Sequence, residues 1–149
     1  MFRCDSNHTI DDKGRIIVPA RFRSVIAESG ENAVMLAKLD DCLYGYTLPQ
    51  WRIIEEKVVS MPETTTEFRR FRRFLIGGAA ECKLDKQDRI LIPPTLREYA
   101  ALEDEVVLMG LLNHFEIWSR KRLDMDAAQL ERDKLASPEF AKQVNSLGL

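Results

Sequence analysis

The chain has 149 residues, of which 45% are hydrophobic and 31% charged, and its formal net charge is −2. This composition is typical of a soluble globular protein, and its apolar runs, near residues 74–80 and 106–112, are far shorter than the roughly 18–20 residues of a membrane span. The first ten residues lack the apolar segment of a signal peptide, and the negative net charge argues against indiscriminate binding of nucleic acid.

The first half of the sequence predicts alternating strands and helices. In chain order these are a strand at 8–10, a turn at 11–14, a strand at 15–18, a helix at 19–29, strands at 34–37 and 43–48, and a helix that begins at 49. Two aspartates and Gly14 favour the tight turn, because glycine adopts positive φ without steric cost. Pro19 and Pro49 each suit the first position of a helix, where no amide partner is needed.

The second half repeats this order after an arginine-rich helix. The predicted elements are a helix at 63–76, a strand at 81–84, a turn at 85–88, a helix at 93–101, strands at 105–111 and 114–118, a helix from Ser119 to about 133, and a short helix after 138. Gly77 and Gly78 end the arginine-rich helix, and Ser119 is expected to cap the helix that follows it.

A duplicated motif is the most informative feature of the chain. Residues 10–23, IDDKGRIIVPARFR, recur 74 positions later as residues 84–97, LDKQDRILIPPTLR. The identical pairs are Asp11/Asp85, Arg15/Arg89, Ile16/Ile90, Pro19/Pro93 and Arg23/Arg97. A single copy of about 50 residues would be marginally stable, so we expect the two copies to share one core in a pseudo-twofold arrangement.

Charge alternates along the chain in four blocks. The net charge is +2 over residues 1–25, −5 over 26–67, +5 over 68–97 and −4 over 98–149. Both positive blocks contain a copy of the motif. The distribution therefore predicts a focused positive surface on an acidic protein.

The predicted turns carry the candidate binding residues. Lys13 and Arg15 flank Gly14 in the first turn, and Lys86 and Arg89 occupy the second. A turn with little side-chain bulk lets backbone amides and a guanidinium approach a phosphate or a guanine edge. The alternative is a solvated hairpin with ordinary surface charges, but the duplication makes that interpretation weaker.

The segment GRIIVPARFR resembles the GR-x-x-x-P-x-x-x-R signature of the AbrB/SpoVT swapped-hairpin family of bacterial DNA-binding domains. Two such copies around an arginine-rich helix that leads into FLIGGAAECKLD resemble the MraZ family of two-repeat regulators. The resemblance extends from Met1-Phe2-Arg3 through Trp51 to Trp118, and is loose after about residue 120.

The resemblance implies an α+β fold, a double-split β-barrel of two pseudo-symmetric AbrB-like repeats decorated with helices. It assigns repeats to 5–51 and 81–124, a helical connector to 52–80 and a helical tail to 125–149. It also implies a large ring-shaped homo-oligomer that binds short tandem repeats in promoter DNA, in the cytoplasm on the nucleoid, and regulates, as a repressor, the division and cell-wall gene cluster. No membrane, small-molecule substrate, cofactor or metal is expected.

Carried over residue by residue, the resemblance favours Arg15 as the main DNA contact, followed by Lys13 and Arg3. Arg89 and Lys86 correspond in the second copy, where Asp88 replaces the expected glycine. Aspartate tolerates a left-handed backbone, but its carboxylate would repel phosphate and could pair with Arg89 or Lys86. We therefore expect the first turn to dominate.

Several other residues have structural interpretations. Arg23 and Arg97 either join helix to turn through ion pairs or contact DNA. The segment FRRFRRF at 68–74 either grips nucleic acid or, as we favour, packs its phenylalanines into a core. Three cysteines without a CxxC spacing predict buried free thiols in a reducing compartment.

Three other classes of function are less favoured by the sequence. The main one is an oligomeric protein-interaction scaffold or enzyme modulator that does not act through DNA. An antitoxin with the same swapped hairpin normally needs a disordered partner-wrapping tail, whereas residues after 120 are patterned for helices. An enzyme is not expected, because the sequence contains no P-loop, GxSxG elbow or paired-histidine metal box.

Overall fold

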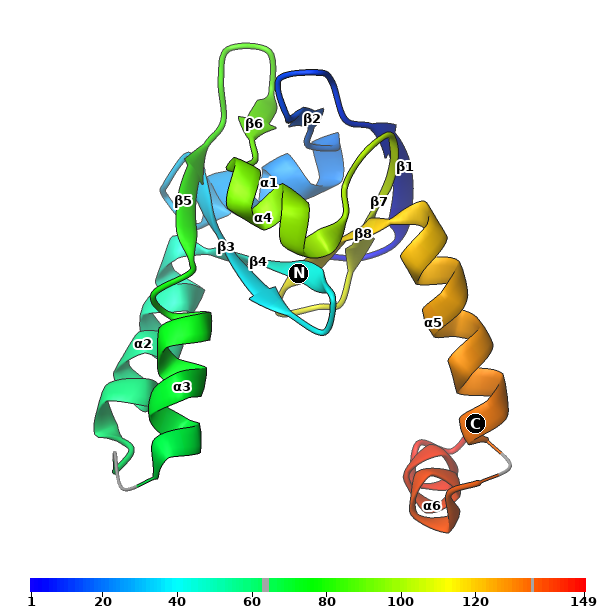
Figure 1. Ribbon diagram of the computed structural model, residues 1–149. Helices are drawn as coiled ribbons and strands as arrows, with labels where there is room; N and C mark the ends of the chain where they lie inside the picture. Colours follow the sequence, from blue (N-terminus) through cyan, green and yellow to red (C-terminus); the bar gives the residue numbers. More distant parts are fainter. Residues whose placement is uncertain (63–64, 135) are drawn as a thin grey trace. The chain divides into compact units, whose positions relative to one another are not determined.

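The computed structural model describes residues 1–62, 65–134 and 136–149, and confirms the predicted α+β class (Figure 1). In chain order the elements are β1 (Asp5–Thr9), β2 (Arg15–Ile17), α1 (Ala20–Glu28), β3 (Ala33–Leu39), β4 (Cys42–Thr47), α2 (Leu48–Ser60), α3 (Thr66–Leu75), β5 (Ala80–Lys83), β6 (Arg89–Leu91), α4 (Pro94–Ala100), β7 (Glu105–Gly110), β8 (Phe115–Ser119), α5 (Arg120–Asp133) and α6 (Pro138–Ser146). The described chain divides into a unit with the sheets, Met1–Ser119, and a helical unit, Arg120–Leu149.

Local sequence explains where most elements begin. Pro19 and Pro93 lie just before α1 and α4, with extended backbone that turns the chain into each helix. The side chain of Thr65 accepts a hydrogen bond from the amide of Phe68 over 3.1 Å and caps α3. The helix predicted at 63–76 is therefore α3; residues 63 and 64 of that prediction lie outside the described residues. Ser119, predicted as a cap, is the last residue of β8.

The two repeats exchange strands. One sheet has the order β1-β7-β8-β4-β3-β5 and a second, smaller sheet pairs β2 with β6. β1 of the first repeat pairs with β7 of the second, and β5 of the second pairs with β3 of the first. All of these pairings are antiparallel. Each repeat thus completes the sheet of the other.

The strand registers obey the pseudo-twofold relation that the duplication predicts. Ile16 faces Ile90 in the β2–β6 ribbon, and Tyr44 faces Glu116 in the β4–β8 pair. These pairs join equivalent positions of the two repeats and so lie on the pseudo-twofold axis. Val18 N donates to Asp88 O over 2.9 Å, and the equivalent bond from Ile92 N to Gly14 O has the same length.

The core lies inside the paired strands and draws on both repeats. Its largest fully buried side chains are Phe2, Phe22, Phe115, Ile16, Ile26, Leu36, Leu43, Ile90, Ile92, Leu96, Leu108 and Ile117. Phe2, Phe22 and Phe115 form an aromatic triad with ring centroids 5.0–5.4 Å apart. Gly45 faces Phe115 across the β4–β8 pair, and a Cβ at position 45 would overlap the Phe115 ring. A glycine opposite the Phe115 ring is thus a packing requirement.

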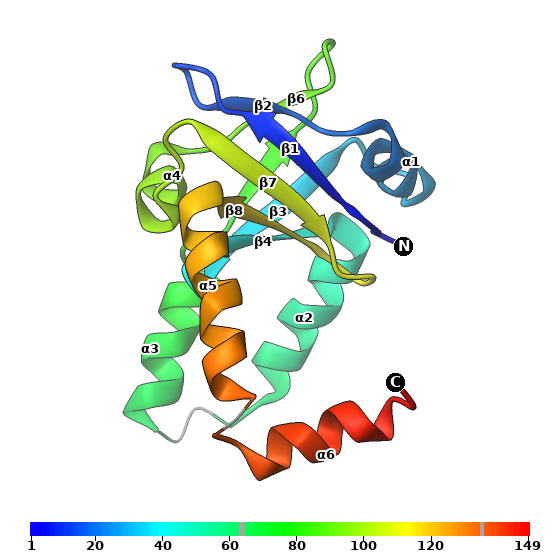
Figure 2. The same ribbon diagram turned by 90° about the vertical axis from the view of Figure 1, so that its right-hand side faces the viewer.

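Helices α2 and α3 extend from the sheet on the side opposite the two motif turns (Figures 1 and 2). Trp51 of α2 is buried and packs against Tyr46, with ring centroids 5.6 Å apart. The prediction that the phenylalanines of 68–74 fill a core holds only in part: Phe68 and Phe74 are half-buried, and Phe74 packs edge-on against Tyr99 with ring centroids 5.5 Å apart. No described residue of α3 is buried, and Phe71 is 41% exposed, because this helix projects beyond the sheet.

The helical unit consists of α5 and α6, and the described part of each has no buried residue. Ser137 caps α6 by accepting a hydrogen bond from the amide of Phe140 over 3.2 Å. No helix of the described chain combines the length and apolar character needed to cross a bilayer. None of the three cysteines, all of which the structure describes, forms a disulfide; Cys42 and Cys82 are buried as expected, whereas Cys4 is exposed.

Adding one methyl group at position 45 should destabilise the protein. We expect Gly45→Ala to lower the free energy of unfolding by about 1–3 kcal/mol, because the new Cβ would overlap the Phe115 ring in a packed core. Urea unfolding of Gly45→Ala, Phe115→Leu and the double variant checks this. The smaller leucine should relieve the overlap, so the double variant should be less destabilised than the sum of the single changes. Additive effects would contradict the packing argument.

Candidate nucleic-acid interface

The first turn is organised by the Asp11 carboxylate. Its Oδ1 accepts hydrogen bonds from the backbone amides of Lys13 (3.0 Å) and Arg15 (2.8 Å). Its Oδ2 accepts from Nε of Arg15 over 2.7 Å. A single carboxylate therefore closes the turn and directs the arginine side chain. Because guanidinium has five N–H donors, the bond through Nε leaves donor capacity for a ligand.

The second turn reproduces this geometry. Asp85 Oδ1 accepts from the amides of Gln87 (2.8 Å) and Arg89 (3.0 Å), and Oδ2 accepts from Nε of Arg89 over 2.9 Å. The side chain of Arg89 is 25% exposed and that of Arg15 is 28% exposed. Both guanidinium groups are oriented at the surface by an acid four residues earlier. The Asp-x-x-x-Arg spacing, present in both copies, is the sequence signal for this arrangement.

The same bonds set the ionisation of both acids. The backbone hydrogen bond from Arg15 is the main reason that the pKa of Asp11 is lowered. The backbone hydrogen bond from Arg89 does the same to the pKa of Asp85. Hydrogen bonds to a carboxylate favour its charged form. Both acids therefore remain charged acceptors at neutral pH.

Each turn is supported by an arginine of the other repeat. Arg97 donates from Nε to Ile92 O over 2.9 Å and lies against Gly14, where an added Cβ would be 2.5 Å from that nitrogen. Gly14 has φ +89°, so it meets both a conformational and a steric need for glycine. Arg23 donates to Val18 O over 2.7 Å and forms an ion pair with Asp88 at 3.6 Å.

The ion-pair partner of Asp88 is Arg23, not Arg89 or Lys86, the two residues with which the sequence suggested it could pair. Asp88 adopts φ +62°, as the glycine-like position requires, and its carboxylate lies beside Arg23 of the first repeat. Strand exchange brings Arg23 to this turn, which local sequence does not reveal. Arg23 and Arg97 both join helix to turn, the structural role that the sequence left open.

Antiparallel pairing brings both turns to one side of the molecule. They extend from opposite ends of the β2–β6 ribbon and rise on either side of it (Figures 1 and 2). Lys13 and Lys86 are exposed on these turns. Four of the five predicted site residues thus belong to one surface, which we call the turn face: the ribbon's outward side and the turns at 11–14 and 85–88.

Arg3 does not lie at the turn face. It precedes β1, whereas the first turn follows the end of that strand, and five strand residues span roughly 17 Å. Arg21 of α1 donates hydrogen bonds to the carbonyl oxygens of Arg3 and Asp5, which holds this N-terminal segment against the helix. Arg3 is exposed, but it is separated from the other four predicted residues.

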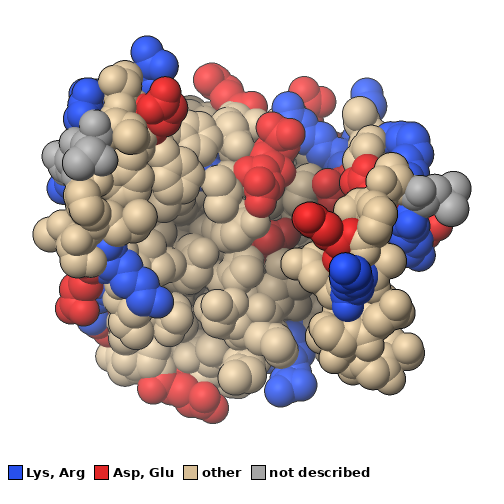
Figure 3. Space-filling view, turned by 90° about the horizontal axis from the view of Figure 1, so that it is seen from below, with Lys and Arg blue, Asp and Glu red and all other residues tan. Residues whose placement is uncertain are grey.

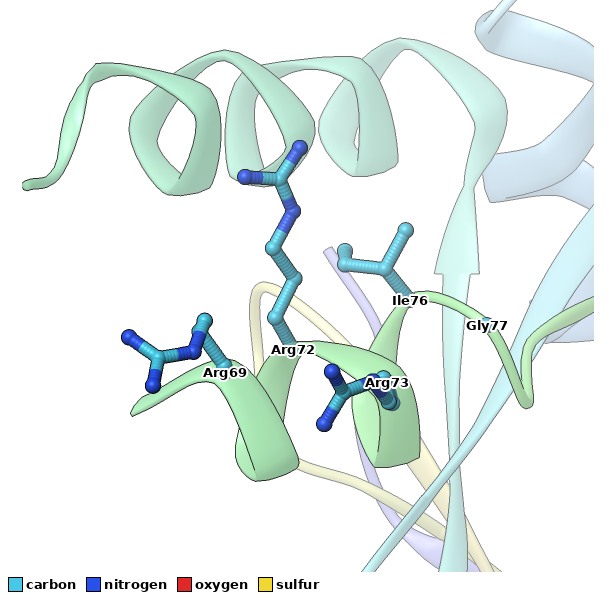
Figure 4. Close-up of a pocket in the computed structure, with 5 residues that line it drawn as sticks. All are labelled: Arg69, Arg72, Arg73, Ile76 and Gly77. Carbon is cyan, nitrogen blue, oxygen red and sulfur yellow. The ribbon is translucent and has the colours of Figure 1, made fainter. Parts of the chain in front are cut away.

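A second basic surface lies on α3. Arg69, Arg72 and Arg73 line a shallow pocket with Ile76 and Gly77. Their guanidinium groups point in different directions rather than toward one centre (Figure 4). Since a compact anion needs converging donors, this pocket does not form a built anion site.

An aromatic and acidic cluster occupies the outer face of β4 and β8. His114 stacks on Tyr44 with centroids 4.7 Å apart, and Trp118 Nε1 donates to the buried carboxylate of Glu116 over 2.8 Å. Burial raises the pKa of Tyr44 and of Tyr46. These bonds satisfy the buried acid, so the cluster is explained by packing. Within the described ranges, His, Cys, Asp and Glu side chains form no group suited to holding a metal ion.

Two interleaved copies of one motif, each presenting a basic turn, define a two-repeat protein that builds one surface from both copies. The family model described as "MraZ protein, putative antitoxin-like" matches residues 1–74 and 75–144, and the chain belongs to the MraZ family. A protein of Desulforapulum autotrophicum named "Transcriptional regulator MraZ" is 52% identical over 149 residues, covering 100% of both chains. Proteins of the same name from Desulfosudis oleivorans (46% identical, 100% of both chains) and Natranaerobius thermophilus (44% identical over 131 residues, 88% of this chain and 90% of that one) are also similar.

Protonation of Asp11 and Asp85 should loosen the two turns only in acid. A carboxyl whose pKa is lower in the folded than in the unfolded protein stabilises the fold at pH values above its unfolded-state pKa. It loses that contribution as the pH falls through its folded-state pKa. We expect the backbone amide shifts of Arg15 and Arg89 to titrate with midpoints below 3.8, the ordinary value for aspartate. NMR spectra recorded between pH 2 and 7, about one per half pH unit, measure these midpoints.

Asp11→Asn provides the matched control, because it keeps an oxygen acceptor and cannot titrate. In that variant the Arg15 amide should lose its titration while the Arg89 amide keeps it. A midpoint at or above 3.8 in the unsubstituted protein would contradict the assigned hydrogen bonds.

Proposed function

We propose that this protein is a sequence-specific DNA-binding transcriptional regulator that acts through the turn face. The observation that carries this proposal is the presentation of two oriented arginines, Arg15 and Arg89, at the ends of one ribbon on one side of the fold. Lys13 and Lys86 add charge beside them, as phosphate contact requires. The name shared by the similar proteins supports the regulatory role.

The finer architecture is also part of the proposal. The strand exchange and pseudo-twofold registers support a double-split β-barrel formed by repeats at 5–51 and 81–124. Residues 52–80 would then be a helical connector and 125–149 a helical tail. The regulator would act in the cytoplasm on the nucleoid, as a repressor of the division and cell-wall gene cluster, without a cofactor or a small-molecule substrate.

An acidic protein with few cations per subunit needs self-assembly to hold DNA tightly. Each phosphate neutralised contributes about −0.9 to the slope of log affinity against log salt concentration. A lone subunit neutralises few phosphates and would therefore bind weakly. A ring homo-oligomer would present many turn faces at once, and linked sites raise avidity by about 10²–10⁴. Neighbours related by ring rotation would meet direct repeats spaced by about one helical turn of DNA, roughly 10–10.5 base pairs.

Exposed apolar side chains support assembly through α2 and α3. Ile53, Val59, Met61 and Phe71 are between 41% and 68% exposed. Seen from the side opposite the turns, uncharged side chains cover most of the surface and Lys and Arg are scattered (Figure 3). If subunits associate through these helices, the exposed apolar side chains would be removed from water.

The two turns are not equivalent in this proposal. Asp88 places a carboxylate 3.6 Å from Arg23 in the second turn, where the first turn has Gly14. A carboxylate repels an approaching phosphate, whereas the glycine lets backbone approach closely. The first turn, with Lys13 and Arg15, would therefore contribute more to affinity, and Arg3 would act only where DNA extends beyond the turn face.

The alternatives receive less support. A protein-interaction scaffold would also use exposed arginines, but it gives no reason for two symmetric turns on one ribbon. The antitoxin role suggested by the family description normally uses a disordered tail, whereas the described residues after 120 are mostly helical. Binding to promoter DNA separates these possibilities.

Removing the arginine of the first turn should weaken DNA binding more than removing that of the second. We expect Arg15→Ala to lower the affinity for promoter DNA upstream of the protein's own gene, and to make the salt slope less steep by about 0.9 for each phosphate that is no longer neutralised. Arg89→Ala should have a smaller effect. Fluorescence anisotropy at several salt concentrations measures both.

Arg132→Ala is the matched control, because Arg132 bonds to Gln129 and belongs to α5, which is neither part of the turns nor one of the helices proposed for assembly. It should leave binding unchanged. Full affinity in Arg15→Ala would refute DNA binding through the turn face, and equal decreases in affinity at positions 15 and 89 would refute the asymmetry.

A polar residue in place of Phe71 should reduce the size of the particle. We expect Phe71→Ser to shift the mass measured by light scattering toward smaller species and to weaken promoter binding, because serine buries much less apolar surface between subunits. Glu56→Ser, which removes an exposed polar side chain from α2, should keep the full mass. A monomeric unsubstituted protein with full promoter affinity would overturn the assembly argument.

A further inference from the structure

The outward side of the β2–β6 ribbon carries two exposed aliphatic side chains. Ile17 is 53% exposed and Leu91 is 55% exposed, whereas Ile16 and Ile90 beside them are almost fully buried. Successive residues of a strand point to opposite sides, so the ribbon has one side in the core and one in solvent. Single exposed aliphatic residues are common. Here, however, two occupy equivalent positions of the repeats.

The ribbon register places each aliphatic side chain beside an arginine of the other repeat. Arg15 faces Leu91, and Ile17 faces Arg89. Directly opposed residues of an antiparallel pair have Cβ atoms roughly 4.5–5.5 Å apart. The outward side therefore consists of two arginine–aliphatic pairs, related by the pseudo-twofold axis that passes between Ile16 and Ile90.

This pattern matches the chemistry of the DNA major groove. A two-stranded ribbon fits a groove about 12 Å wide, and the minor groove, about 6 Å wide, is too narrow. Base edges there offer guanine acceptors to arginine and the C5-methyl group of thymine to an apolar side chain. The turns that rise on either side of the ribbon carry Lys13 and Lys86, which suits contact with the phosphates that border a groove (Figure 2).

We propose that the β2–β6 ribbon enters the major groove and that Ile17 and Leu91 contact thymine C5-methyl groups, which sets part of the sequence preference. This inference rests on the proposed DNA-binding function and extends it to residues outside the basic turns. The arginines beside them hold the ribbon against the bases. A serine or charged residue at position 17 or 91 would not recognise a methyl group.

Replacing thymine by deoxyuridine removes only the methyl group and tests this contact. Each thymine of the promoter repeats is replaced in turn, at the same place in every repeat, and binding is measured with the full-length protein. At one or more positions the unsubstituted protein should lose affinity by at least about fourfold, the fold-change that corresponds to burying one methyl group at about 0.8 kcal/mol. Ile17→Ala or Leu91→Ala should make binding insensitive to the same replacement.

The controls separate failure of the inference from failure of the proposed function. Leu112→Ala alters an exposed aliphatic residue (50%) of the β7–β8 turn, outside the ribbon and outside helices α2 and α3, and should keep full sensitivity to deoxyuridine. If Arg15→Ala abolishes binding but no deoxyuridine replacement affects the unsubstituted protein, the methyl contact is refuted and DNA binding stands. The same conclusion follows if Ile17→Ala and Leu91→Ala weaken binding to thymine and deoxyuridine DNA equally. If Arg15→Ala binds with full affinity, the proposed function fails as well.

Discussion

The ribbon of β2 and β6 is held by hydrogen bonds that run between the two repeats, so neither repeat can form it alone. Val18 N bonds to Asp88 O, and Ile92 N bonds to Gly14 O, which ties each strand to the turn of the other copy. Arg23 and Arg97 reach across in the same way. Asp11 and Asp85 orient Arg15 and Arg89 within each turn, and these inter-repeat bonds hold both turns on the ribbon, so the presentation of both arginines on one surface depends on the pairing of the repeats. A repeat expressed alone would lack the support of its own turn.

Divergence between the copies is accommodated at a few complementary positions. Gly45 faces Phe115, so the small residue of one repeat makes room for the ring of the other. On the pseudo-twofold axis Tyr44 faces Glu116, whose carboxylate bonds to Trp118. Such pairs keep the backbone close to twofold symmetry while the side chains differ. The two turns have diverged similarly, because Asp88 keeps the left-handed backbone of Gly14 but adds a carboxylate.

The electrostatic design combines an acidic chain with locally oriented cations. A net charge of −2 argues against indiscriminate binding of polyanions. The aspartate four residues before each arginine fixes the direction of its guanidinium. An arginine held in this way would lose less side-chain entropy on contact with DNA than a mobile one. The aliphatic residues Ile17 and Leu91 add no charge to this surface, and shape and methyl contact would be their contribution to specificity.

The sequence alone determined the duplication, the α+β class, most helix and strand positions and the basic turns. These signals are local, because Asp and Gly set turns, proline starts helices and apolar alternation marks strands. They can therefore be recognised in the sequence before the fold is known. The sequence also indicated the family, through the spacing of arginine and proline that both copies share. Only the tertiary structure decided that Asp88 pairs with Arg23, that Arg3 lies apart from the turns, and that α3 leaves Phe71 exposed. These outcomes depend on strand exchange, which brings together residues more than 60 positions apart, such as Arg23 and Asp88. They also depend on where a helix leaves the sheet, which no local pattern encodes.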